Sequence, residues 1–204
     1  MKRGTSFIRR FVPLAVAGIL VVVLAACRGV GGGYLPPQTP PQTPVFTGQA
    51  SFGFTFKCER GDLAIELAYN DKGSSPLLPF GSLSPFGIHG TVDAIDPVLE
   101  SATCIDENPP PGGNELIFLG RYRLTSSAPS GFPAACKTTT PLCRFEVIVR
   151  DNDGNQAPSM NDFFSIKLST AVGVCTDPSC SQLPTGTVFY ARAGLLAGGN
   201  LTVR

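Results

Sequence analysis

A short cluster of acids and amides has the clearest spacing for metal chemistry in this chain. Asp151, Asp153 and Asn155 occupy positions 1, 3 and 5 of a calcium-loop pattern, and Asp162 falls at position 12. Oxygens at alternating positions can turn toward one cation, and calcium takes about six to eight oxygen ligands. However, glycine stands at position 4 (Gly154) rather than 6. The alternative is a polar hairpin connection in which Asp-Gly makes the turn, with no cofactor bound.

Histidine chemistry depends on one residue. His89 is the only histidine, so any Ser-His-Asp or Cys-His machinery would have to use it. No Gly-x-Ser-x-Gly elbow accompanies it. Acid pairs such as Asp93 with Asp96, or Glu59 with Asp62, are too common to indicate a glycosidase. We therefore predict a surface histidine and a protein that is not an enzyme, with a histidine-independent hydrolase as an alternative.

The first 26 residues are typical of an export signal. Lys2, Arg3, Arg9 and Arg10 form a basic start, and an apolar run follows over residues 11–26. Sixteen residues at about 1.5 Å each reach about 24 Å, which is short of the roughly 30 Å hydrocarbon core of a bilayer. This pattern favours a cleaved signal peptide over a membrane span.

The end of that run, Leu24-Ala25-Ala26-Cys27, resembles the lipobox of bacterial lipoproteins at all four positions. The resemblance implies that the chain is cut before Cys27 and that the Cys27 thiol carries a diacylglycerol anchor. The alternative is an ordinary secretory signal cut after Ala26. Arg28 stands where many inner-membrane lipoproteins of Gram-negative bacteria carry aspartate. We therefore expect a lipid-anchored protein facing the periplasm or the cell exterior, in the outer membrane if the organism is Gram-negative.

Lipidation of Cys27 would leave six cysteines: Cys58, Cys104, Cys136, Cys143, Cys175 and Cys180. An even set in an exported chain predicts three disulfides. Two pairs bracket short loops, which favours 136–143 and 175–180 and leaves 58–104. A zinc site is the alternative, but the chain has no Cys-x-x-Cys pair.

Residues 27–44 combine a glycine run with two Pro-Gln-Thr-Pro units, a composition typical of a flexible or extended linker. We predict a disordered tether here, between the anchor and a domain spanning 45–204. Without residues 1–26, the chain has 12 basic and 15 acidic residues, a net charge of about −3. This balance argues against a nucleic-acid binder.

The rest of the chain alternates apolar and polar residues with period two. Phe52, Phe54 and Phe56 alternate with small or polar residues, and the same pattern recurs over 63–69, 144–150 and 164–168. Further candidate strands are 87–95, 115–124, 187–191 and 200–204. Alternation of this kind is typical of half-buried antiparallel strands. We predict an all-β fold: a single antiparallel β-sandwich or barrel domain.

Four segments, 48–54, 149–154, 161–166 and 196–203, resemble a β-domain of unknown function found in secreted and cell-surface bacterial proteins. The matching residues are strand starts and turns, so the resemblance implies an exported β-domain and carries over no catalytic residue. The sequence therefore predicts a lipid-anchored cell-envelope protein whose β-domain is a non-catalytic structural or binding module. An adhesin or glycan-binding module is the alternative, and the protein or glycan partner is left open.

Overall fold

The computed structural model describes residues 27–42, 44–59, 62–76, 81–91, 114–141, 143–152, 161–172, 183–184 and 186–203. Eleven strands and one short 3-10 helix form within these ranges. In chain order they are β1 (Cys27–Leu35), β2 (Ala50–Glu59), β3 (Asp62–Asp71), β4 (Ser75–Pro76), β5 (Ser82–Leu83), β6 (Phe86–Thr91), β7 (Glu115–Leu124), η1 (Ala134–Cys136), β8 (Cys143–Arg150), β9 (Phe163–Val172), β10 (Val188–Leu195) and β11 (Gly198–Val203).

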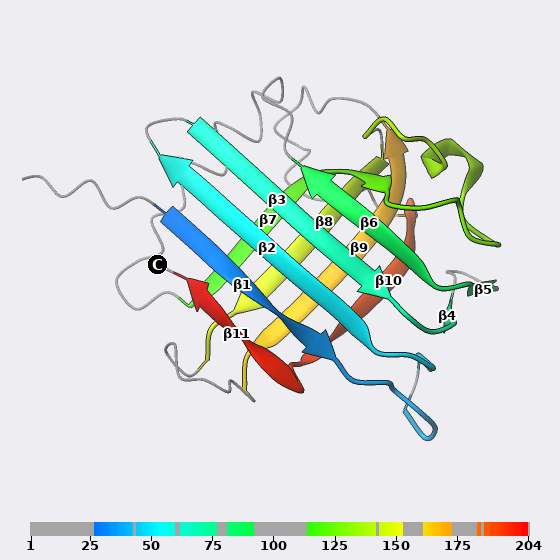
Figure 1. Ribbon diagram of the computed structural model, residues 1–204, viewed down its shortest axis with the longest axis horizontal. Coiled ribbons are helices and arrows are strands. Elements are labelled where there is room, and N and C mark those ends of the chain that lie inside the picture. Colours follow the sequence, from blue (N-terminus) through cyan, green and yellow to red (C-terminus); the bar gives the residue numbers. More distant parts are fainter. Residues whose placement is uncertain are drawn as a thin grey trace, which may run out of the picture.

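Nine of these strands form one antiparallel sheet in the order β10-β9-β8-β7-β6-β3-β2-β1-β11. The sheet curls on itself into a half-barrel (Figure 1): β1, β2, β3 and β6 form one layer, and β7 to β10 cross behind it at a steep angle. The pairing of β6 with β7 joins the two layers. The predicted all-β fold is confirmed.

Aromatic side chains fill the space between the two layers. The alternation in β2 turns Phe52, Phe54 and Phe56 inward, where all three are buried. Phe52 stacks on Phe164 of β9 with ring centroids 3.7 Å apart, and Phe54 lies 5.4 Å from Phe118 of β7. Burial of such side chains contributes about 1.5–3 kcal/mol each, so this core dominates the stability of the domain.

The expectation of a flexible tether over residues 27–44 is wrong for its first half. Residues 27–35 form β1, which pairs with β2 on one side and with β11 on the other. Two of its glycines, Gly31 and Gly33, are required by close packing. A Cβ at Gly33 would lie 2.5 Å from the carbonyl oxygen of Gly198, and one at Gly31 would lie 2.5 Å from Leu201 Cδ2. The folded domain therefore includes the segment from Cys27, as well as residues after 45.

One predicted disulfide lies in the described part of the chain and is confirmed. Cys136 of η1 is bonded to Cys143, the first residue of β8, across seven positions of sequence. The bond fixes η1 against the start of β8. No helix in the described ranges has the length and apolar character needed to cross a membrane.

Candidate functional site

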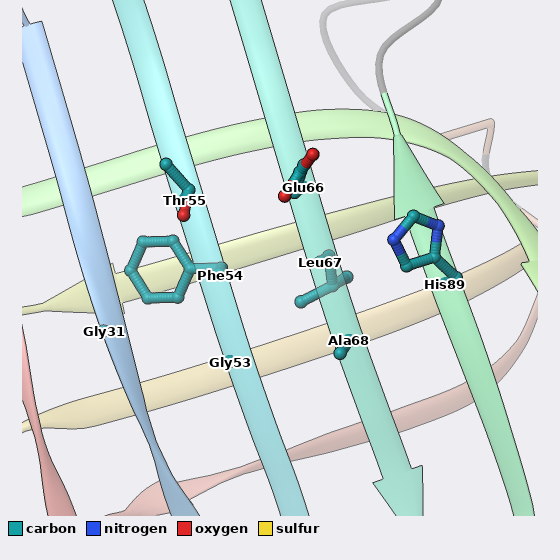
Figure 2. Close-up of a pocket in the computed structure, with 8 residues that line it drawn as sticks. All are labelled: Gly31, Gly53, Phe54, Thr55, Glu66, Leu67, Ala68 and His89. Atoms are coloured by element: carbon teal, nitrogen blue, oxygen red, sulfur yellow. The ribbon is translucent and has the colours of Figure 1, made fainter.

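The outer face of the front layer carries a shallow depression of about 330 Å³ over β1, β2, β3 and β6 (Figure 2). Strand register explains its floor, because Gly53 lies opposite Ala68, and Ala68 lies opposite His89. Small residues on adjacent strands leave the backbone of the sheet uncovered. The result is a hollow that crosses the strands and ends at the imidazole of His89.

Polar side chains border this hollow. Thr55 and Glu66 lie directly opposite each other on β2 and β3, and both are exposed. Neither side chain forms a hydrogen bond or ion pair within the described part of the chain. His89 is partly buried, and its Nδ1 is shielded from solvent with no hydrogen-bond partner among the described residues. The side chains of Thr55 and Glu66 are therefore available to a ligand, whereas His89 Nδ1 is not.

The arrangement does not form a nucleophilic active site. Thr55 supplies the side-chain hydroxyl in the lining, but β3 lies between its strand and that of His89. Two strand spacings separate the two residues by about 10 Å, whereas a nucleophile and its base need hydrogen-bond contact at about 2.6–3.2 Å. The lining also holds one carboxylate, Glu66, rather than the two that glycoside hydrolysis uses. The geometry of this depression therefore favours binding of a ligand over catalysis.

A second cluster of chemically active residues is buried at the end of the sheet where β3 stops. Asp71 of β3 and Arg192 of β10 form an ion pair at 3.0 Å, and both side chains are fully buried. The Asp71 carboxylate also accepts hydrogen bonds from the hydroxyls of Tyr190, at 2.7 Å, and Ser75, at 2.6 Å. The hydroxyl of Tyr69 is hydrogen-bonded to that of Tyr190.

Arg192 also holds the connection between β1 and β2. One guanidinium nitrogen donates to the carbonyl oxygens of Pro36 and Gly48, both at 2.8 Å, and the guanidinium lies 4.5 Å from the centre of the Phe46 ring. These contacts hold the segment after β1 against β10, which is an edge of the sheet. A buried pair of this kind is destabilising when one partner is lost, and it has no ligand-facing surface here. We assign the cluster a structural role.

A further hollow, of about 500 Å³, lies beside β10 between Ala191, Ala193 and the loop residues Pro44 and Phe46. Lys167 lines it, but its ammonium group is paired with Glu146 at 2.6 Å. Gln38 donates to the carbonyl oxygen of Ala193 and so covers part of the β10 edge. The polar groups of this hollow are therefore largely satisfied within the protein.

Of the predicted calcium ligands, the structure describes Asp151 and Asp162, while Asp153 and Asn155 lie outside the described residues. Both described carboxylates are buried and accept backbone N–H groups. Asp162 Oδ1 accepts from Asn152 at 2.9 Å, and Oδ2 accepts from Leu201 of β11 at 3.0 Å. Asp151 accepts from Val203 at 3.4 Å. The carboxylates of Asp151 and Asp162 therefore hold β11 against the end of β8 and the start of β9 through hydrogen bonds.

The structure describes only some of the other cysteines. Cys104, Cys175 and Cys180 lie outside the described residues, so the pairings 58–104 and 175–180 stay predictions. Cys58 lies in β2, where the strand register places it directly opposite Cys27. Opposed residues of antiparallel strands have Cα atoms about 4.5–5.5 Å apart, which falls within disulfide range. A disulfide between Cys27 and Cys58 is therefore the alternative to the predicted lipidation of Cys27 and to the predicted bond between Cys58 and Cys104.

Sequence reasoning missed Asp71, Arg192 and the role of Glu66. Glu66 has the alternation of an outward-facing residue, but its place in a hollow depends on which strands become neighbours. Arg192 alternates with small residues and offers no local sign that it is buried. Comparison with protein-family models, curated protein sequences and solved structures finds no match to this chain.

Proposed function

We propose that this protein is a lipid-anchored component of a bacterial cell envelope, whose β-domain is a non-catalytic binding module. The observation that carries the proposal is the sequence Leu24-Ala25-Ala26-Cys27 after a basic start and a short apolar run. An acyl anchor contributes roughly 0.8 kcal/mol for each buried methylene, and two or more chains give stable attachment.

Cys27, the proposed lipidation site, is the first residue of β1. A lipid on Cys27 would hold the end of the sheet that contains Cys58 and Val203 close to the membrane, because these residues share the same end of β1 and its neighbours (Figure 1). The nine residues of β1 then extend about 30 Å away from the anchor.

A binding role is supported by the outer depression. Its free polar side chains, Thr55 and Glu66, lie on strands of the sheet rather than on loops. The separation of Thr55 from His89 argues against acyl-transfer chemistry, and the single carboxylate of the lining argues against glycoside hydrolysis. These observations favour recognition of a ligand without turnover.

Metabolic labelling with an alkynyl fatty acid tests the anchor. We expect label on the wild-type protein and none on the Cys27→Ser variant. Cys58→Ser is the matched control, since it removes the thiol opposite Cys27 in the sheet, and it should keep the label. A wild-type protein without label, or label retained by Cys27→Ser, would show that Cys27 is not the anchor.

A further inference from the structure

The outer depression is bordered on both sides by groups that can form hydrogen bonds. On one side Ser51 lies opposite Asn70, and on the other side Thr55 lies opposite Glu66. Between these two rows the floor consists of Gly53 and Ala68, with Gly32 next to Gly53 on β1. From β1 to β6 the floor crosses three strand spacings, or about 14 Å.

The floor is open to solvent. A Cβ built on Gly53 has a single neighbour within 4 Å, the carbonyl oxygen of Gly31 at 3.9 Å. Tyr34, the exposed aromatic residue beside this area, lies over β11 instead, because a Cβ at Gly198 would be 2.6 Å from its Cε1. No described side chain therefore fills the hollow above Gly53.

The residues that line and border the hollow indicate the chemistry of the ligand. Asn70, Thr55 and Glu66 are exposed, and their side chains have no hydrogen bond or ion pair within the described ranges. Hydroxyl, amide and carboxylate groups together suit a ligand that carries many hydroxyl groups, since a carboxylate accepts strong hydrogen bonds from hydroxyls. Glu66 is the charged residue of the lining, and its carboxylate disfavours an anionic ligand in the hollow. The basic residues Lys57 and Arg123 lie just outside the lining.

A peptide strand fits this surface poorly. Peptides that add to sheets use the free backbone groups of an edge strand. The strands β2 and β3 beneath the hollow lie inside the sheet, where each is paired on both sides. A ligand on this face must therefore be held by side chains and by contact with the floor.

We propose that this depression binds a short neutral glycan chain that lies across β1, β2, β3 and β6. The inference rests on the proposed function in one respect, since it takes the β-domain to be a binding module. Sugar hydroxyls contact Ser51 and Asn70 on one side and Thr55 and Glu66 on the other. The partly buried ring of His89 closes one end of the hollow.

The test uses the full-length protein in detergent and an array of neutral oligosaccharides of glucose, galactose, mannose and N-acetylglucosamine, with hyaluronan and heparin fragments as anionic probes. Gly53→Val fills the floor at a position with free space, and Glu66→Ala removes the carboxylate. Ala64→Val is the matched control, because Ala64 is an exposed residue of β3 outside the lining. Titration calorimetry then measures affinity for each neutral oligosaccharide that binds.

We expect binding to at least one neutral oligosaccharide. Glu66→Ala should weaken it about tenfold or more, the effect of losing one hydrogen bond to a charged group. Gly53→Val should weaken it at least as much, because its side chain occupies the space above the floor. Ala64→Val should bind like the wild type. Absence of neutral binding, preference for the anionic probes, or unchanged affinity in Gly53→Val would overturn the proposal.

The same experiment separates the two proposals. If the bound oligosaccharide is recovered cleaved, the depression is a glycan site but the non-catalytic function is wrong. If no neutral glycan binds while Cys27 carries the lipid label, the anchored protein stands and the glycan site fails.

Discussion

The carboxylates of this protein have different roles according to whether they are buried or exposed. Asp71 and Asp162 are buried and use their oxygens to hold other parts of the chain. Glu66 is exposed and has no partner within the described ranges. Sequence spacing alone grouped Asp162 with a calcium loop, whereas in the structure its oxygens accept backbone amides from two different segments.

Asp162→Asn tests this role. An asparagine side chain has one acceptor oxygen and would turn an amide group toward either the Asn152 or the Leu201 N–H. A buried donor left without a partner costs about 1–3 kcal/mol of unfolding free energy. We expect this loss in urea denaturation, with the same size in calcium and in a chelator. The exposed control Glu66→Gln should change stability by less than about 0.5 kcal/mol. A loss seen only in the presence of calcium would instead support the metal site.

The buried tyrosines predict a stability limit at high pH. Burial raises the pKa of Tyr69 and Tyr122 well above the ordinary tyrosine value, and burial, with the nearby Tyr69 and Asp71, does the same to the pKa of Tyr190. In the unfolded chain tyrosines lose their protons near pH 10. The folded state retains these protons, so its stability is complete below about pH 10 and falls as the pH rises further.

Absorbance of tyrosinate and circular dichroism, recorded together during an alkaline titration, test this limit. The chain has four tyrosines. We expect Tyr69, Tyr122 and Tyr190 to stay protonated until the β-sheet signal is lost. Reversible ionisation of all four tyrosines in a chain that keeps its sheet signal would show that the three are not buried as described.

At the scale of elements, alternation was a sound guide to the strands around Phe52, Phe145 and Phe164. The further candidate strand 115–124 forms β7 with the same bounds. It could not find β1, because a glycine run has no side chains to alternate and has the composition of a linker. The need for glycine there comes from the neighbouring strands, which a single sequence does not reveal. The depression was missed for the same reason, since its residues meet only through strand pairing.

A pair of glycine substitutions tests whether β1 is an integral strand. Gly33→Ala places a Cβ about 2.5 Å from a backbone oxygen of β11, so the two strands must move apart. We expect it to lower the unfolding free energy by about 1–3 kcal/mol, the usual cost of overpacking. Gly53→Ala, which meets open space, should raise stability by about 0.5–1 kcal/mol by restricting the unfolded chain. Equal stability of the two variants in urea denaturation would contradict the role of β1.

At the scale of the whole molecule, the start of β1 links the fold to its proposed anchor. Cys27 lies at the same end of the sheet as Cys58 and the last residues of β11. If Cys27 carries lipid, this end of the sheet faces the membrane, and no long tether separates the β-domain from the membrane surface. The outer depression lies on the side of the domain, where a ligand in the envelope can reach it. The far end holds the buried cluster of Asp71 and Arg192.

Cys27 can have only one chemical fate in a given molecule, and this makes the central claim directly testable. A thioether to lipid leaves Cys58 for its predicted bond with Cys104. A disulfide from Cys27 to Cys58, across the register of β1 and β2, would exclude the lipid. The two outcomes differ in the mass of the amino-terminal peptide and in the peptide that carries Cys58.

The decisive measurement is mass spectrometry of the mature protein, digested without reduction. The account predicts an amino-terminal peptide that begins at Cys27 and carries a diacylglyceryl thioether, with Cys58 linked to Cys104. An amino-terminal peptide with an unmodified Cys27, or with Cys27 in a disulfide with Cys58, would contradict the account of this protein as a lipid-anchored envelope module.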